Sequence, residues 1–291
     1  MKRFFAFGFV VLFVCGSAFG QSLKLGLGLN YFSADERYNE NGDVKSYGDT
    51  YTEMRVPLSI SYLPTDKLTI GILVPVVSRS YDYVDPLDID ASGSGIGDIE
   101  IGGSYKLLEE TDSSPVLSCS LSLILPTGKN YLQDNLADDE SALGGPMFGS
   151  GFFYTGNNSV DIGINVSKNV FPVVLTANFG YLMTMETKAK EWGDYKYNWG
   201  DSIKYGISAE YPLENISPSI TIEGVSTGKY EVEGIEEPDS ETSILRIIPG
   251  IKAEIAENTN LKAGIAIPVS GKNEFKGITI SVGFSYMLNL L

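Results

Sequence analysis

The chain has 291 residues, of which 37 are acidic, 21 are basic and none is histidine, so its formal net charge is −16. Such an acidic chain repels phosphate backbones, which argues against a nucleic-acid partner. Without histidine it has no Ser-His-Asp triad, no Cys-His pair and no His-based metal site. Its two cysteines cannot build a disulfide framework. We therefore expect no catalytic residue, no cofactor and no metal site.

Residues 1–20 have the pattern of an export signal. A positive start, Met1-Lys2-Arg3, precedes an apolar run at 4–14, and small residues flank Phe19. A secretory signal peptide has these three parts and is removed after export. We predict that the mature protein is residues 21–291, forming a single domain. No later stretch is an apolar run long enough for a transmembrane helix.

From residue 22 onward, apolar and polar residues alternate, and clusters of turn-forming residues interrupt the pattern. In 51–63 one face holds Met54, Val56, Leu58, Ile60 and Tyr62, and the other holds Glu53, Arg55, Ser59 and Ser61. A period of two is that of a β-strand with one apolar face. We predict an all-β chain with about twelve strands, at 22–34, 51–62, 67–83, 97–108, 115–126, 158–168, 172–186, 197–213, 217–231, 241–255, 259–268 and 276–290.

Long and short connections alternate between these strands. The longer ones are 35–50, 84–96, 127–157, 187–196, 232–240 and 269–275. This order predicts an up-and-down antiparallel barrel with loops at one rim and tight turns at the other. An even strand number in a closed sheet suits a transmembrane barrel, because hydrocarbon offers no partner to an open sheet edge. A soluble β-sandwich is the alternative, but the serines, glycines and asparagines of the polar face are too small and too polar to fill a core.

The polar faces of the predicted strands carry charged residues that would line the lumen of a barrel. They are Glu53, Arg55, Asp98, Glu100, Lys106, Asp161, Lys204, Glu210, Glu223, Arg246, Lys252, Glu254 and Lys262. Acids and bases nearly balance, so we expect a nearly neutral lumen and an excess of acid in the loops. The candidates for lining residues that set selectivity are Arg55, Glu100, Lys204, Glu223, Arg246 and Lys252.

Three of these candidates fall near mid-strand on consecutive predicted strands. Lys204, Glu223 and Arg246 are therefore expected to form a cross-strand ladder. Two roles stay open for it: a salt-bridge network that braces the wall, or a selectivity constriction. On the opposite face, Cys119 lies among leucines, where we expect a small lipid-facing hydrophobe and not a nucleophile.

A glycine-rich run links the chain to a known family. Gly95-Ile96-Gly97-Asp98-Ile99-Glu100-Ile101-Gly102, then Tyr105, then Leu125-Pro126-Thr127-Gly128 resembles the outer-membrane β-barrel transporters of the meta-pathway phenol-degradation family. The segment 159–167, followed by Asn178-Phe179-Gly180-Tyr181, is similar to the next hairpin of that family. The resemblance covers about residues 90–290. It implies passage of small, apolar molecules across the outer membrane and no catalysis.

These observations predict a monomeric channel in the outer membrane of a Gram-negative bacterium that passes small, hydrophobic or aromatic solutes. Its expected partners are outer-membrane lipid, a small-molecule solute and, during biogenesis, the barrel-assembly machinery. The long loop 127–157 contains an apolar stretch, 142–153, which we expect to fold into the lumen. The alternative is a non-transporting surface barrel whose acidic loops make adhesive or envelope-stabilising contacts.

Overall fold

The computed structural model describes residues 22–46, 48, 50–83, 89–128, 157–189 and 195–290. The predicted signal peptide and most of loop 127–157, including its apolar stretch, lie outside these residues. Within them, no helix is long and apolar enough to cross a membrane.

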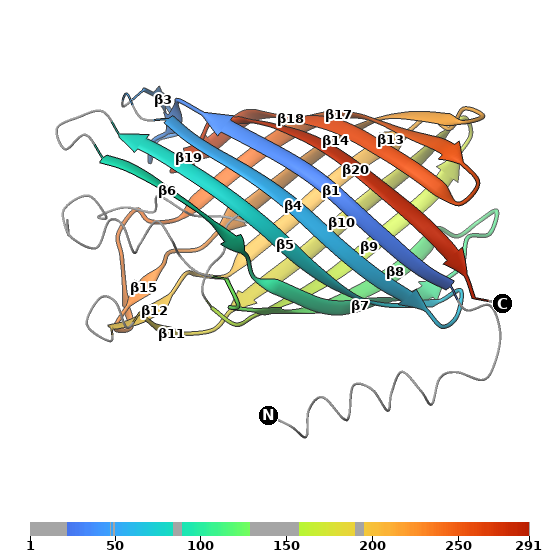
Figure 1. Cartoon of the computed structure of the whole chain (residues 1–291), viewed down its shortest axis with the longest axis horizontal. Helices are drawn as coiled ribbons and strands as arrows, with labels where there is room; N and C mark the ends of the chain where they lie inside the picture. Colours follow the sequence, from blue (N-terminus) through green and yellow to red (C-terminus); the bar gives the residue numbers. More distant parts are fainter. Residues whose placement is uncertain are drawn as a thin grey trace, which may run out of the picture.

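The wall of the molecule is one closed antiparallel sheet (Figure 1). Its strands are β1 (Ser22–Ala34), β4 (Thr50–Leu63), β5 (Leu68–Tyr83), β6 (Ile89–Ile96), β7 (Ile99–Leu108), β8 (Val116–Leu125), β9 (Ser159–Val170), β10 (Val173–Thr184), β13 (Ser202–Glu210), β14 (Ile216–Thr227), β17 (Thr242–Ala256), β18 (Thr259–Lys272) and β20 (Ile278–Asn289). β1 pairs with both β20 and β4, and β4 pairs with β5, which closes the sheet. β6 and β7 both pair with β5, one after the other, and share one position in the wall. The result is a barrel of twelve strands, as predicted.

The two ends of the barrel differ. Figure 1 shows the long connections at one end, here called the loop end, and the tight turns at the other, the turn end, where β1 begins and β20 stops. Two small sheets lie at the loop end. One consists of β2 (Arg37–Tyr38), β3 (Val44–Lys45) and β19 (Glu274–Phe275), and the other of β11 (Thr187–Ala189), β12 (Tyr195–Asn198), β15 (Glu231–Val232) and β16 (Ile235–Glu236).

The predicted strand boundaries are corrected in several places. The predicted strand 259–268 continues as β18 to Lys272, so most of the predicted connection 269–275 is strand. β6 occupies the second half of the predicted loop 84–96. The predicted strand 197–213 is divided into β12 and β13 at Gly200, whose φ of 76° a strand does not adopt. The predicted strand 217–231 ends at Thr227, and a short hairpin, β15–β16, fills the connection that follows.

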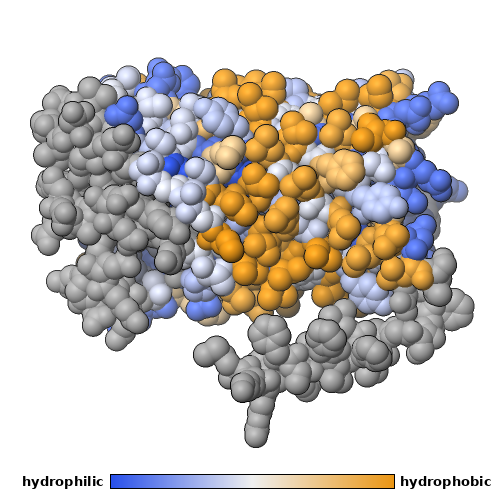
Figure 2. Space-filling model, viewed as in Figure 1, coloured by the Kyte–Doolittle hydropathy of each residue, from blue (hydrophilic) through white to orange (hydrophobic). Residues whose placement is uncertain are grey.

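The outer face of the wall is apolar and exposed. Leu27 on β1 is 49% exposed, Ile60 on β4 is 51% exposed and Leu121 on β8 is 54% exposed. Figure 2 shows such residues as a band over the middle of the barrel, with hydrophilic residues toward both ends. A continuous apolar belt of this kind is what a barrel presents to hydrocarbon. Cys119 shares the outward parity of Leu121 on β8, as predicted.

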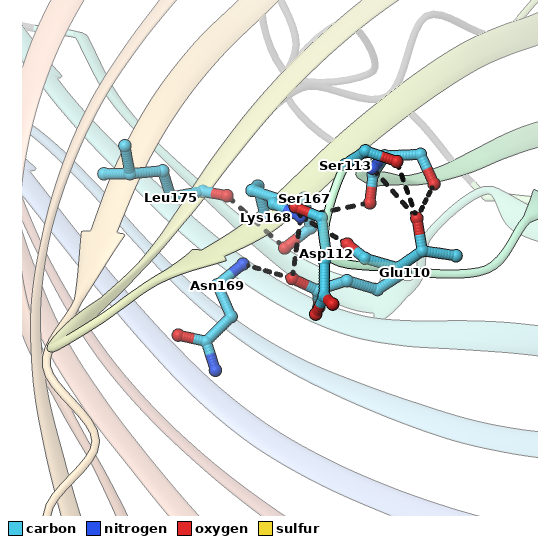
Figure 3. Close-up of polar contacts among 9 residues, drawn as sticks. Glu110, Asp112, Ser113, Ser167, Lys168, Asn169 and Leu175 are labelled. Carbon is cyan, nitrogen blue, oxygen red and sulfur yellow. Dashed lines mark hydrogen bonds and ion pairs between the residues drawn. The ribbon is translucent and has the colours of Figure 1, made fainter.

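The turn between β7 and β8 is anchored to the neighbouring hairpin at the turn end. The Lys168 ammonium on β9 donates to the carbonyl oxygens of Thr111, Asp112 and Ser114, at 2.5 to 3.3 Å (Figure 3). The backbone N–H of Asn169 donates to the Glu110 carboxylate at 2.7 Å. A single lysine thus binds three carbonyl groups of this turn, one of which, that of Ser114, also accepts from the Thr111 N–H.

Candidate functional site in the barrel lumen

At the loop end, residues from two connections pack against the inner wall. The ring of Phe275, on β19, stacks on Tyr51 of β4, with centroids 4.9 Å apart. The ring of Phe32, on β1, is tilted against Tyr51, with centroids 5.9 Å apart. The Arg37 guanidinium, on β2, lies 4.5 Å from the Phe275 ring centroid and donates to the Tyr81 hydroxyl at 2.6 Å. We call these five residues the mouth cluster.

The mouth cluster narrows the barrel because its wall members point inward. Tyr51 is 0% exposed and shares a strand face with Glu53, opposite the exposed Met54. A fully buried tyrosine on the inner face needs atoms inside the barrel to cover it, and the connections containing β2 and β19 supply them. These loops therefore fold into the loop end and do not extend away from it.

One step below the mouth cluster, a carboxylate lies between two guanidinium groups. Glu53 accepts from Arg79 Nε at 2.8 Å through one oxygen, and its other oxygen lies 3.2 Å from Arg55 Nη2. The Tyr51 hydroxyl donates to Glu53 at 3.1 Å. Glu53 is only 5% exposed, and the charge of Asp98 also acts on Arg55. The arrangement offsets the desolvation of a buried carboxylate with three partners.

The expected ladder is present as two separate pairs. Glu223 and Arg246 are register partners on β14 and β17, and their charged atoms lie 3.6 Å apart. Lys204 instead donates to Asp161 on β9 at 2.6 Å. It reaches over β10 at Gly180, which pairs with Lys204 and carries no side chain to block the contact.

Arg246 also belongs to the closure of the loop end. It is 3% exposed, and the charge of Glu274 on β19 acts on it together with that of Glu223. Glu274 and Phe275 are adjacent residues, so β19 is held by Arg246 on β17 and by Tyr51 on β4. Two of the selectivity candidates, Arg55 and Arg246, thus lie where loops meet the wall.

The remaining candidates lie lower in the barrel. Glu100 stands on β7 opposite Leu73 of β5 and Ile124 of β8. Lys252 on β17 is the register partner of Lys262 on β18, so two like charges face each other. None of the six candidates has been tested for a role in selectivity, and that assignment stays a prediction.

Sequence reasoning missed two inward-facing charges. Lys24 alternates with Leu25 on β1, so the period of two could have identified it. Arg79 was hidden because β5 is apolar on both faces between Leu73 and Val77, which removes the alternation that assigns a face. Only the pairing of Arg79 with Glu53 in the β4–β5 register places it in the lumen.

Outside the wall, the second small sheet has an aromatic core. Tyr197, Trp199 and Tyr230 contact one another with ring centroids 5.7 to 6.2 Å apart. Burial, with smaller effects of Tyr230 and Glu237, raises the pKa of Tyr197 to about 12. Over the residues described, no cluster of acids and cysteines has the form of a metal site.

The fold is similar to that of solved outer-membrane proteins. An outer membrane channel from Pseudomonas putida F1 superimposes with a TM-score of 0.73 and 14% identity, over 93% of this chain and 96% of that chain. The β domain of the Bordetella autotransporter Brka gives a TM-score of 0.51 and 11% identity, over 91% of this chain and 99% of that chain. At these identities the likeness is one of fold.

The sequence itself matches a family model. The family is described as "Putative MetA-pathway of phenol degradation", and the match covers residues 41–284.

Proposed function

The chain belongs to this family, whose model spans most of its length, and from that premise we propose that it is an outer-membrane channel for small solutes, hydrophobic or aromatic compounds among them. The observation that carries the proposal is the contrast between the two faces of one closed wall. The outer face is an exposed apolar belt, and the inner face carries charged and small polar residues. Such a wall separates a polar lumen from lipid, which a channel requires.

The loop end would face the cell exterior. Barrels of the bacterial outer membrane carry their long loops outside and their tight turns on the periplasmic side. The mouth cluster then lies at the outer entrance. Because it closes part of the cross-section with rings and an arginine, it favours small solutes over large ones. The family description supports aromatic compounds as the solute class.

The route to the membrane follows from the same proposal. Residues 1–20 would direct export and be removed, and the barrel-assembly machinery would insert residues 21–291 as a monomer. The described wall is complete within one chain, since β1 pairs with β20, so no second copy is needed to close it.

Liposome swelling tests the function. Purified barrel in liposomes should admit small aromatic solutes faster than disaccharides, and barrel-free liposomes should admit neither at that rate. Heat-modifiable gel migration of the same sample would verify that the barrel is folded. A folded barrel that admits no solute of either kind would exclude the channel and favour the alternative, a surface protein that acts through its acidic loops.

A further inference from the structure

Three lysines lie on the inner face in the half of the barrel nearest the turn end. Lys24 on β1, Lys252 on β17 and Lys262 on β18 each alternate with outward apolar residues, namely Leu25, Ile251 and Leu261. β17, β18, β20 and β1 are consecutive in the wall, so the three lysines share one side of the lumen.

The three positive charges are close enough to act on one another. Lys252 and Lys262 are direct register partners, and side chains in such positions start about 5 Å apart. The charges of both act on Lys24. Like charges placed directly opposite each other on neighbouring strands are destabilising. Folding alone therefore gives no reason for this arrangement.

No carboxylate compensates these lysines in the part of the chain that the structure describes. Ion pairs formed by other inward-facing residues include Glu53 with Arg55 and Arg79, and Lys204 with Asp161. By contrast, none of the three lysines has an ion-pair partner among the described residues. The inward-facing acid nearest along β17 is Glu254, two residues beyond Lys252, and it forms no ion pair with them.

Among the described residues, the space beside the lysines is open. Lys262 pairs with Gly283 of β20, and a Cβ placed on Gly283 would meet no atom of these residues within 4 Å. This differs from Gly26, Gly102 and Gly163 on the same inner face, where an added Cβ would collide with a neighbouring serine. The wall thus leaves room for a ligand where the uncompensated charge is concentrated.

We propose that Lys24, Lys252 and Lys262 form an anion-binding site in the lumen that takes small organic carboxylates, aromatic acids among them. The inference rests on the proposed channel function and narrows its solutes. Ammonium groups bind carboxylate oxygens through short, charge-assisted hydrogen bonds. A one-sided cationic wall also raises the local concentration of anions and lowers that of cations. An aromatic acid that passes the mouth cluster would therefore be held at this site before release at the turn end.

Binding is measured first, independently of transport, with benzoate as the probe and benzyl alcohol as its neutral counterpart. Titration calorimetry on the detergent-solubilised barrel should show benzoate binding that falls at least tenfold in Lys252→Gln plus Lys262→Gln. The matched control is Lys106→Gln, which removes an inward-facing lysine from β7, across the barrel, and should leave binding unchanged. Benzyl alcohol should not distinguish the variants.

A second variant separates a lost site from a damaged fold. Lys252→Glu places a carboxylate opposite Lys262, so it should raise the unfolding temperature by removing the like-charge contact. It should nevertheless abolish benzoate binding, because Lys262 then has a partner within the wall. A variant that is more stable and still binds benzoate as the unaltered protein does would overturn the proposal.

Planar-bilayer reversal potentials then connect the site to transport. The unaltered channel should be anion-selective in a KCl gradient. In the double Gln variant the reversal potential should shift toward the value set by the bulk mobilities of K⁺ and Cl⁻ alone. Benzoate binding without any conductance would refute the channel and leave the site standing. A conducting channel whose benzoate affinity and reversal potential are both unaffected by the double variant would refute the site and leave the channel standing.

Discussion

The ring of Phe275 stacks on that of Tyr51, with centroids 4.9 Å apart and planes inclined by 19°. Phe275 belongs to the connection between β18 and β20, and Tyr51 belongs to the inner face of β4. The contact joins two parts of the chain that lie far apart in sequence, and it fixes a loop inside the barrel. The loop end is therefore partly closed by a loop whose Phe275 ring is buried against the wall.

Removing the Phe275 ring should open the loop end. Phe275→Ala is expected to increase single-channel conductance and to lower the stability of the barrel by about 3–5 kcal/mol, because an aromatic pair and the buried area of a core-like ring are lost. Ile235→Ala is the control, since Ile235 is an exposed apolar residue of another loop-end strand, β16. Planar-bilayer recordings measure the conductance. An unaltered conductance in Phe275→Ala would show that the mouth cluster does not limit the pore.

The buried Glu53 should be among the most sensitive positions in the lumen. Glu53→Gln removes the carboxylate that lies between the adjacent cations Arg55 and Arg79, and breaking a buried pair in this way costs about 3–5 kcal/mol. Glu100→Gln, the same change at an inward-facing position without a described ion pair, should cost less than about 1 kcal/mol. Urea unfolding followed by gel migration compares the two. Equal losses would mean that the two arginines are compensated from elsewhere.

The turn end offers a prediction independent of transport. Lys168→Met keeps the aliphatic part of the side chain but removes the donor to three carbonyl groups of the β7–β8 turn. A charged donor contributes about 1.5–3 kcal/mol, so the variant should unfold at a lower urea concentration and expose the turn to protease. Lys67→Met is the control, because Lys67 is in an exposed ion pair with Glu109 at 3.5 Å. Such pairs contribute about 0–1 kcal/mol.

Alkaline titration tests the aromatic core of the second small sheet. Because burial raises the pKa of Tyr197 to about 12, its ring should stay protonated when ordinary tyrosines ionise near pH 10. Folding is then favoured by the neutral ring below about pH 10, and this contribution is lost as the pH rises from there through about 12. The difference in phenolate absorbance between the unaltered protein and Tyr197→Phe isolates this group. A difference curve with its midpoint near pH 10 would show that the ring is not buried.

The wall of this barrel is predicted well from the sequence. Contact with lipid requires an apolar residue at every second position, and this alternation is the pattern on which the prediction depends. Every predicted strand overlaps a wall strand, and Met54, Leu58 and Ile60 face outward as expected. β6 was missed because its sequence, IDASGSGI, has too few apolar residues to show a face. The residues of β6 alone do not indicate a strand, which is defined by its pairing with β5.

The lumen is predictable only in part, because its contacts depend on register between strands. Lys204 was expected to join Glu223, but its partner is Asp161, two strands away, and the contact passes over Gly180. The lysine site likewise needs β1 and β17 to lie on one side of the lumen, with only β20 and β18 between them, although more than two hundred residues separate Lys24 from Lys252. Alternation along a strand shows which face a residue lies on. Which side chains it contacts across the lumen depends on the order and register of the strands in the closed sheet.

The Lys204–Asp161 pair gives a final prediction that separates stability from selectivity. The Lys204 ammonium lies 2.6 Å from the Asp161 carboxylate, and Lys204→Glu places a second acid near that carboxylate, so the variant should lose stability through repulsion. Adding Asp161→Lys restores opposite charges in reversed order, and the double variant should recover most of the unfolding temperature while the net charge of the lumen is unchanged.

If the pair only braces the wall, the reversal potential of this double variant equals that of the unaltered channel. If Lys204 also acts on passing ions, the double variant differs, because the positive charge has moved from β13 to β9. Reversal potentials measured beside the temperature of gel-shift unfolding separate the two roles. Failure of the second change to recover stability would show that the two side chains are not energetically coupled.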